Sequence, residues 1–188
     1  TKTAQGDLYL ALYAGNDDPP RFVVAPSSVE DCFYQAMQAF YLSETFQMPV
    51  ILLADQSLSH RTETLPMPDT KMVAVTERMR PEVDDEDDYQ RYRLTESGIS
   101  PMGVPGFDPT PYTATGLEHD EYGAPNYTPG MHTAQLDKRG LKFEVVADAL
   151  CGLEPPLGCI AYGMPEDQAQ VGVLAWGSTA GVVREAVE

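Results

Sequence analysis

Residues 22–54 read FVVAPSSVEDCFYQAMQAFYLSETFQMPVILLA, and this stretch decides the fold. Its first four residues, 22–25, form a short apolar run that predicts a strand. Ser27-Ser28-Val29-Glu30 then has the pattern of a capping box, in which a serine oxygen accepts from a free N–H and the glutamate reaches back. Apolar residues at 29, 32, 33, 36, 39 and 40 follow a 3.6-residue period. They predict one helix that ends at Met48-Pro49, because the residue before a proline avoids the α region.

The next five residues, 50–54 (VILLA), are apolar without alternation. Such a run is typical of a buried strand in a parallel sheet that is covered on both faces. A strand, a helix and a strand in this order predict a right-handed βαβ unit. We therefore expect an α/β fold with a doubly wound parallel sheet.

Asp55-Gln56 follows directly after the second predicted strand. Open α/β sheets bind their ligands beyond the carboxyl ends of the strands, so Asp55 is a candidate ligand contact. The alternative is a carboxylate whose hydrogen bonds are satisfied locally at the strand end. The sequence leaves both interpretations open.

Residues 60–111 change character, because prolines at 66, 68, 81, 101, 105, 109 and 111 forbid long regular elements, and the excursion they open is expected to run over 60–130. The acidic run at 84–88 (DDEDD) lacks the alternation, central glycine and closing glutamate of an EF-hand loop, so we interpret it as a solvated acidic patch. We expect an extended excursion with short helices. A connection of this length is either functional or part of an interface.

The C-terminal part of the chain predicts a second α/β module. A helix is expected over residues 133–150, and residues 170–176 (QVGVLAW) form a second buried-strand candidate. Gly177-Ser178-Thr179 then opens a helix, where free N–H groups could bind an anion or form only a tight turn. The chain begins at Thr1 and ends at Glu188 inside this expected helix, so we expect a fragment of a longer subunit.

Composition excludes several classes of function. Twelve basic and twenty-nine acidic residues give a formal net charge of −17, which disfavours nucleic acid and anionic membrane surfaces as partners. No apolar run reaches the length of a membrane span. The three cysteines, Cys32, Cys151 and Cys159, lack the spacing of a zinc site, an iron–sulfur site or a disulfide framework. These features favour a reducing cytoplasm.

The stretch 112–123 (YTATGLEHDEYG) is the strongest candidate for a functional loop, because it is polar and bounded by glycines. A metal site built from Glu118, His119, Asp120 and Glu121 alone would be cramped. A loop that holds a partner or substrate through His119 and Asp120 is a better hypothesis, and a plain surface turn is the remaining one. Cys32 lies on the inner face of the predicted helix, which favours a core residue over a nucleophile.

Seven motifs in the same order resemble those of the 2-oxoacid:ferredoxin oxidoreductases. They are TKTAQGDL (1–8), APSSVEDCF (25–33), VILLADQSL (50–58), RTETLP (61–66), RLTESGISP (93–101), TGLEHDEYG (115–123) and WGST (176–179). Within that family they are most similar to the α subunit of the 2-oxoglutarate synthase type. The resemblance covers roughly residues 1–135 and 170–188, while residues 140–168 match poorly.

This resemblance implies an enzyme that decarboxylates a 2-oxoacid on thiamine diphosphate, passes electrons to ferredoxin and forms an acyl-CoA from coenzyme A. It implies that residues 1–60 are the C-terminal part of the pyrimidine-type domain that covers the cofactor. Residues 61–168 would be an excursion and interdomain linker, and 169–188 would begin a transketolase C-terminal-like domain. The partner β subunit would hold the diphosphate, its Mg²⁺ and the iron–sulfur cluster.

The resemblance also implies site residues. Thr1 lies nearest to where the substrate carboxylate would bind, and the loop containing Thr115, Glu118, His119 and Asp120 faces the subunit interface. The family's cofactor-activating glutamate and substrate-binding arginine would precede Thr1, so no residue here is assigned as an acid or base and the isolated chain is expected to be inactive. Two alternatives remain, a non-catalytic interaction module of the same fold and an acidic metal-binding protein built on residues 82–88 and 118–121.

Overall fold

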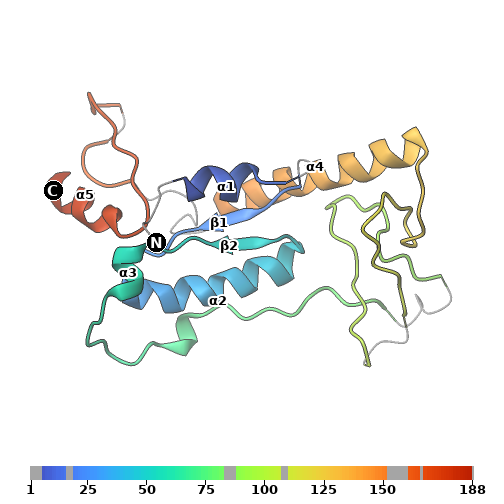
Figure 1. Cartoon of the computed structure of the whole chain (residues 1–188), viewed down its shortest axis with the longest axis horizontal. Helices are drawn as coiled ribbons and strands as arrows, with labels where there is room; N and C mark the ends of the chain where they lie inside the picture. The colour runs from blue at the N-terminus through green and yellow to red at the C-terminus, as the bar shows by residue number, and fades with distance from the viewer. Residues whose placement is uncertain are drawn as a thin grey trace. The chain divides into compact units, whose positions relative to one another are not determined.

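A computed structural model describes residues 6–15, 19–82, 88–106, 110–151, 161–165 and 167–187. The chain divides into two compact units. Unit 1 comprises Thr1–Ser43, Met48–Val75 and Leu153–Glu188, and unit 2 comprises Glu44–Gln47 and Thr76–Gly152. The described helices and strands are shown in Figure 1.

The predicted βαβ unit is confirmed in unit 1. Strand β1 (Phe22–Val24) is followed by helix α2 (Val29–Phe46) and strand β2 (Val50–Leu52). The two strands are parallel, with Val23 opposite Ile51. In Figure 1 this small sheet lies between α2 and the short helix α1 (Asp7–Tyr13). The two apolar runs can pair as parallel strands because the helix between them carries the chain back to the end of the sheet where β1 begins.

The N-terminus of α2 is capped one residue later than predicted, and the carboxylate that reaches back does so to the residue before the cap. Ser28 Oγ accepts from Asp31 N at 3.1 Å, so Ser28 is the capping residue. The carboxylate that reaches back belongs to Asp31, whose Oδ2 accepts from Ser27 N at 2.8 Å. The prediction of Glu30 in this role was wrong, because the reciprocal residue lies three positions after the cap and Glu30 lies only two after Ser28.

Burial of the strands is weaker than predicted. Phe22 is 8% exposed, yet Leu52 is 39% exposed. A parallel strand is fully covered only when helices pack on both faces along its whole length, and the described residues of unit 1 do not cover Leu52 in that way. The buried apolar residues of unit 1 are instead spread over several elements, with Leu42 on α2, Leu58 on α3 and Met48 between α2 and β2.

The excursion begins with two short helices, α3 (Gln56–His60) and the 3₁₀ helix η1 (Thr70–Met72). From residue 73 to 128 the described residues are irregular apart from one isolated bridge between His119 and Pro125. The core of this part contains Tyr89, Ile99, Ser100 and Thr110. The acidic run at 84–88 lies almost entirely outside the described residues.

Helix α4 (Pro129–Cys151) confirms the helix predicted over 133–150 and begins four residues earlier. Pro129 is its first residue, a position where the missing N–H costs nothing. Val146 is the buried apolar residue of this helix.

The strand predicted over 170–176 is wrong. These residues have no regular structure, and Val171, Val173 and Leu174 are 81%, 63% and 79% exposed. A strand needs a hydrogen-bonded neighbour, and the described residues supply none beside this segment. The helix expected after it is present as α5 (Thr179–Val187).

Candidate functional site

The family resemblance singles out five site residues, namely Thr1, Thr115, Glu118, His119 and Asp120. Thr1 lies outside the described residues, so the structure says nothing of its surroundings. The other four belong to a segment of unit 2 that we call the acidic loop, residues 115–126. Its geometry can be built up residue by residue.

Asp120 organises the turn of the acidic loop. Its Oδ1 accepts from the backbone N–H groups of Tyr122 and Ala124, both at 3.0 Å. Asp120 N donates to Ala124 O at 2.9 Å, and Gly123 N donates to Asp120 O at 3.1 Å. This local bonding is typical of aspartate in turns and fixes the loop without help from a ligand.

Glu121 and His119 attach the acidic loop to the segment around Tyr92. Tyr92 N donates to Glu121 O at 2.8 Å, and Leu94 N donates to Glu121 Oε1 at 2.8 Å. The ring of His119 lies 3.9 Å from that of Tyr92, between ring centres, and His119 Nδ1 lies 2.9 Å from Asp120 O. Burial raises the pKa of Tyr92, so this phenol stays neutral.

Glu118 attaches the acidic loop to α4. Its Oε2 lies 3.2 Å from His132 Nδ1, and its Oε1 lies 3.8 Å from Arg139 Nη2. Thr115 Oγ1 accepts from Leu117 N at 3.2 Å, which bends the start of the loop. The outward surface of the loop is apolar and aromatic, with Leu117 53% and Tyr122 50% exposed.

The carboxylates of the acidic loop therefore point to different partners. Glu118 contacts α4, Asp120 its own turn and Glu121 the backbone at 94. Across the described ranges, no three His, Cys, Asp or Glu side chains gather as metal ligands would. The structure brings Glu118, His119 and Asp120 together as parts of one packed loop.

Asp55 is a satisfied strand-end carboxylate. Its Oδ1 accepts from Leu58 N at 2.8 Å and caps α3, while its Oδ2 accepts from Ser178 N at 2.9 Å. Hydrogen bonding from Ser178 first, and then from the α3 backbone, holds the pKa of Asp55 below its ordinary value. The same bond uses the N–H of Ser178, so the Gly177-Ser178 turn is occupied by a carboxylate of its own unit.

Cys32 is a free, half-buried thiol on α2. Burial raises its pKa, and the nearby carboxylates of Asp31 and Asp55 raise it further. A protonated thiol of this kind is a poor nucleophile, which favours the interpretation of Cys32 as a packing residue.

Sequence reasoning missed two lysines of α4, the buried Lys138 and the half-buried Lys142. Lys138 is 9% exposed, and its Nζ donates to Ser100 Oγ at 2.5 Å. Lys142 Nζ donates to Gln47 O at 3.1 Å. Burial lowers the pKa of Lys138 to about 7 and that of Lys142 to about 8. Their spacing of four residues on one helix face was the available signal, but lysine at that spacing normally faces water.

A holding site for thiamine diphosphate and Mg²⁺ at the carboxyl ends of β1 and β2 would need free N–H groups or carboxylate ligands there. The strand ends lead into Ala25-Pro26 and Leu53-Ala54-Asp55, which are apolar except for Asp55, and both oxygens of Asp55 already accept backbone N–H groups. These described residues fit an apolar wall beside a cofactor and do not fit a diphosphate or metal cradle.

None of the helices in the described ranges combines the length and the hydropathy of a membrane span.

Comparison with known proteins places these features in a family context. Residues 1–138 match the family described as pyruvate flavodoxin/ferredoxin oxidoreductase, thiamine diphosphate-binding. The whole chain is 34% identical to 2-oxoacid:ferredoxin oxidoreductase 2, subunit alpha, of Aeropyrum pernix and covers 28% of that protein. It is 28% identical to the 2-oxoglutarate synthase subunit KorA of Methanothermobacter thermautotrophicus and covers 47% of it.

A solved structure is similar as well. The 2-oxoglutarate:ferredoxin oxidoreductase from Magnetococcus marinus, with 2-oxoglutarate, coenzyme A and succinyl-CoA bound, matches 97% of this chain at 38% identity. The TM-score is 0.80, and the match covers 30% of that chain. The present chain thus spans less than half the length of each of these relatives.

Proposed function

The chain belongs to the pyruvate flavodoxin/ferredoxin oxidoreductase family of thiamine diphosphate-binding domains, and we propose that it serves as part of the α subunit of a 2-oxoacid:ferredoxin oxidoreductase. The proposed reaction is the oxidative decarboxylation of 2-oxoglutarate, or a related 2-oxoacid, to an acyl-CoA with electron transfer to ferredoxin. The observation that carries this proposal is the match at 38% identity and TM-score 0.80 to a 2-oxoglutarate:ferredoxin oxidoreductase.

Thiamine diphosphate supplies the carbanion chemistry of this reaction when it is bound. The role we propose for this chain is to provide one wall of the cleft that covers the cofactor, since ligands of α/β domains bind beyond the strand ends. The ends of β1 and β2 support this role because they are apolar and hold no charge of their own except that of Asp55. The partner β subunit would hold the diphosphate, Mg²⁺ and the iron–sulfur cluster.

The division of labour along the chain follows from this proposal. Residues 1–60 would complete the pyrimidine-type domain, 61–168 would form the excursion and interdomain linker, and 169–188 would begin a transketolase C-terminal-like domain. Thr1 would lie closest to the substrate carboxylate. The exposed apolar segment 171–176 supports the assignment of 169–188, because exposed apolar surface of this kind is typical of a contact with another part of a protein.

The acidic loop is proposed as the interface with the β subunit. Thr115, Glu118, His119 and Asp120 would fix its shape from within, and the exposed side chains of Leu117 and Tyr122 would make the contact. Exposed aromatic and aliphatic groups on a rigid loop are typical of interface cores. The reaction would take place in the cytoplasm, as the absence of a disulfide framework among Cys32, Cys151 and Cys159 favours.

The test is an assay of the complete enzyme. The full α-subunit gene is expressed with its neighbouring β-subunit gene, and reduction of a viologen dye is followed with 2-oxoglutarate or pyruvate. We expect reduction that depends on both the 2-oxoacid and coenzyme A, with omission of coenzyme A as the control. Absence of turnover with any 2-oxoacid, in a preparation that carries thiamine diphosphate, would favour the non-catalytic interaction module instead.

A further inference from the structure

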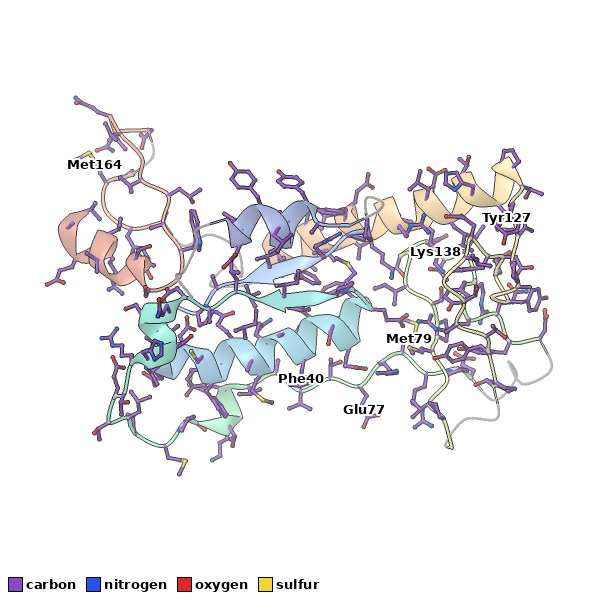
Figure 2. The ribbon with its side chains drawn as sticks, in the orientation of Figure 1. Phe40, Glu77, Met79, Tyr127, Lys138 and Met164 are labelled. Carbon is purple, nitrogen blue, oxygen red and sulfur yellow. The ribbon has the colours of Figure 1, made fainter. Side chains whose placement is uncertain are left out.

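We propose that Lys138 and Lys142 form a proton-controlled latch that holds residues 89–103, and through them the acidic loop, against α4 while Lys138 is neutral. All groups of this latch belong to unit 2, and the latch requires no catalytic activity. Both lysines are residues of α4. They lie one turn apart on the same face of α4, and Figure 2 shows Lys138 on the part of α4 beside the loops of unit 2.

The latch closes through hydrogen bonds to distant parts of the sequence. Lys138 Nζ donates to Ser100 Oγ, and Ser100 Oγ donates to Arg93 O at 2.7 Å. Lys142 Nζ donates to Gln47 O, while Gln47 Nε2 donates to Ser100 O at 2.7 Å. Ser100 is 1% exposed, so water cannot replace the bonds that Ser100 makes.

Close packing makes the same contact rigid. Gly98 has φ +70°, and a Cβ at this position would lie 2.6 Å from Lys138 O and 2.9 Å from Lys142 Cγ. At Gly98, the backbone of the segment 89–103 therefore packs directly against the helical turn that carries both lysines. Movement of the Lys142 side chain would disturb this contact, because its Cγ is one of the atoms closest to Gly98.

The latch extends to the acidic loop. Ser100 Oγ holds the carbonyl of Arg93, and the residues on either side of Arg93 are the ones that bond to Glu121. Tyr92 N and Leu94 N both donate to Glu121, one to its carbonyl and one to its side chain. Loss of the Lys138–Ser100 bond therefore weakens one attachment of the acidic loop to α4. Another attachment is that of Glu118 to His132 and Arg139.

The protonation state of Lys138 and the charges around it determine whether the latch is closed. Lys138 faces Lys142 on its own helix, Arg91 from the excursion and the carboxylate of Glu121 from the acidic loop, and Lys142 also faces Arg91 and Arg139. Glu121 already accepts from Leu94 N, and Arg91 lies over the rings of Tyr92 and Tyr112. Protonation of Lys138 thus adds a buried cation to a group that is mostly cationic.

The direction of the pH dependence follows from proton uptake. In the closed state the pKa of Lys138 is about 7, whereas an amine released to water has the ordinary value of 10.5. Opening therefore binds a proton between pH 7 and 10.5, so opening becomes easier as the pH falls through this range and levels off below pH 7.

Lysine titration by NMR is the first test. The chain has only four lysines, Lys2, Lys71, Lys138 and Lys142, so labelling their ε carbons with ¹³C gives a resolvable set of resonances. We expect two resonances to titrate near pH 7 and pH 8, and each to disappear in Lys138→Met or Lys142→Met. Titration of all four lysine resonances near pH 10.5 would overturn the proposal. This outcome is measured on the unmodified chain, so it does not depend on whether the variants fold.

Amide hydrogen exchange is the second test, with rates corrected for the intrinsic pH dependence of exchange. We expect protection of residues 89–103 and 115–126 to fall at least about tenfold between pH 9 and pH 7, which linkage at Lys138 alone supplies. The Lys138→Met/Lys142→Met double variant should lose this dependence. The exposed Lys71 on η1 provides the control, since Lys71→Met should keep it. Equal protection at both pH values in the unmodified chain would refute the latch.

Discussion

Gly123 determines the shape of the acidic loop at the scale of a single residue. Its φ is +89°, and a Cβ here would lie 2.3 Å from Thr113 O and 3.0 Å from Tyr92 Cε2. Glycine is the residue that adopts this conformation without strain and also leaves room for the backbone of Thr113. The turn at Asp120 depends on it, because Gly123 N donates to Asp120 O.

Gly123→Ala should therefore destabilise unit 2. The left-handed backbone and the close approach to Thr113 O together are expected to lower the free energy of unfolding by about 2–3 kcal/mol. A urea titration followed by circular dichroism measures the change. Gly116→Ala is the matched control, because a Cβ at Gly116 meets no atom within 4 Å, and it should change stability by less than about 0.5 kcal/mol. Equal effects of the two variants would contradict the steric argument.

At the level of elements, a bidentate ion pair joins the excursion to the last turn of α2. Arg78 Nε donates to Glu44 Oε2 and Arg78 Nη2 to Glu44 Oε1, both at 2.7 Å. The neighbouring residue Met79 accepts from Met102 N at 2.8 Å. An irregular segment with no ladder of backbone hydrogen bonds needs such side-chain attachments to hold its course.

Arg78→Lys should weaken this attachment because an ammonium group cannot form both parallel bonds. We expect a loss of about 1 kcal/mol at pH 7. The hydrogen bond from Arg78 lowers the pKa of Glu44 below 4.5, so this stabilisation is present above pH 4.5 and disappears as the pH falls through the lowered pKa. Urea titrations at pH 7 and at successively lower pH should thus show a difference between the two proteins that is full at pH 7 and shrinks as the pH falls below 4.5.

Arg61→Lys is the control for that comparison. Arg61 pairs with Glu63, but its side chain is 51% exposed, so its replacement should change stability by less than about 0.5 kcal/mol. A larger effect of Arg61→Lys than of Arg78→Lys would show that geometry does not govern these pairs.

At the scale of the whole molecule, apolar surface is exposed on both units. In unit 1 it includes Tyr9 and Tyr13 of α1 together with segment 171–176, and in unit 2 it includes Leu117 and Tyr127. Exposure of this kind is typical of proteins that bury surface against partners. The proposed α-subunit role accounts for it, because the α subunit would share its cofactor cleft with a β subunit.

Leu117→Asp tests the interface at the acidic loop. Leu117 is 53% exposed, so the substitution should leave the unfolding of this chain unchanged and weaken association with the β subunit at least about tenfold. Titration calorimetry of the two subunits measures the affinity. Leu117→Met, which keeps an apolar side chain of similar size, should bind like the unmodified chain. Unaltered binding of Leu117→Asp would place the interface elsewhere.

The βαβ unit, the helix α4 and the family resemblance could all be predicted from the amino-acid sequence. These features rest on local patterns, since apolar periodicity and capping residues act over a few positions in the chain. Local reasoning came close at the cap of α2, where the correct carboxylate, Asp31, lies next to the predicted Glu30. It was wrong at 170–176, where an apolar run resembles a strand but pairing depends on a neighbour.

Only the tertiary structure decided which polar groups meet. Asp55 and Ser178 are 123 residues apart in the chain, Lys142 and Gln47 are 95 apart, and Lys138 and Ser100 are 38 apart. No periodicity records such a pairing, because it depends on where whole segments return after a turn. The protonation of Lys138 is decided in the same way, since burial and the surrounding charges exist only after the chain has folded.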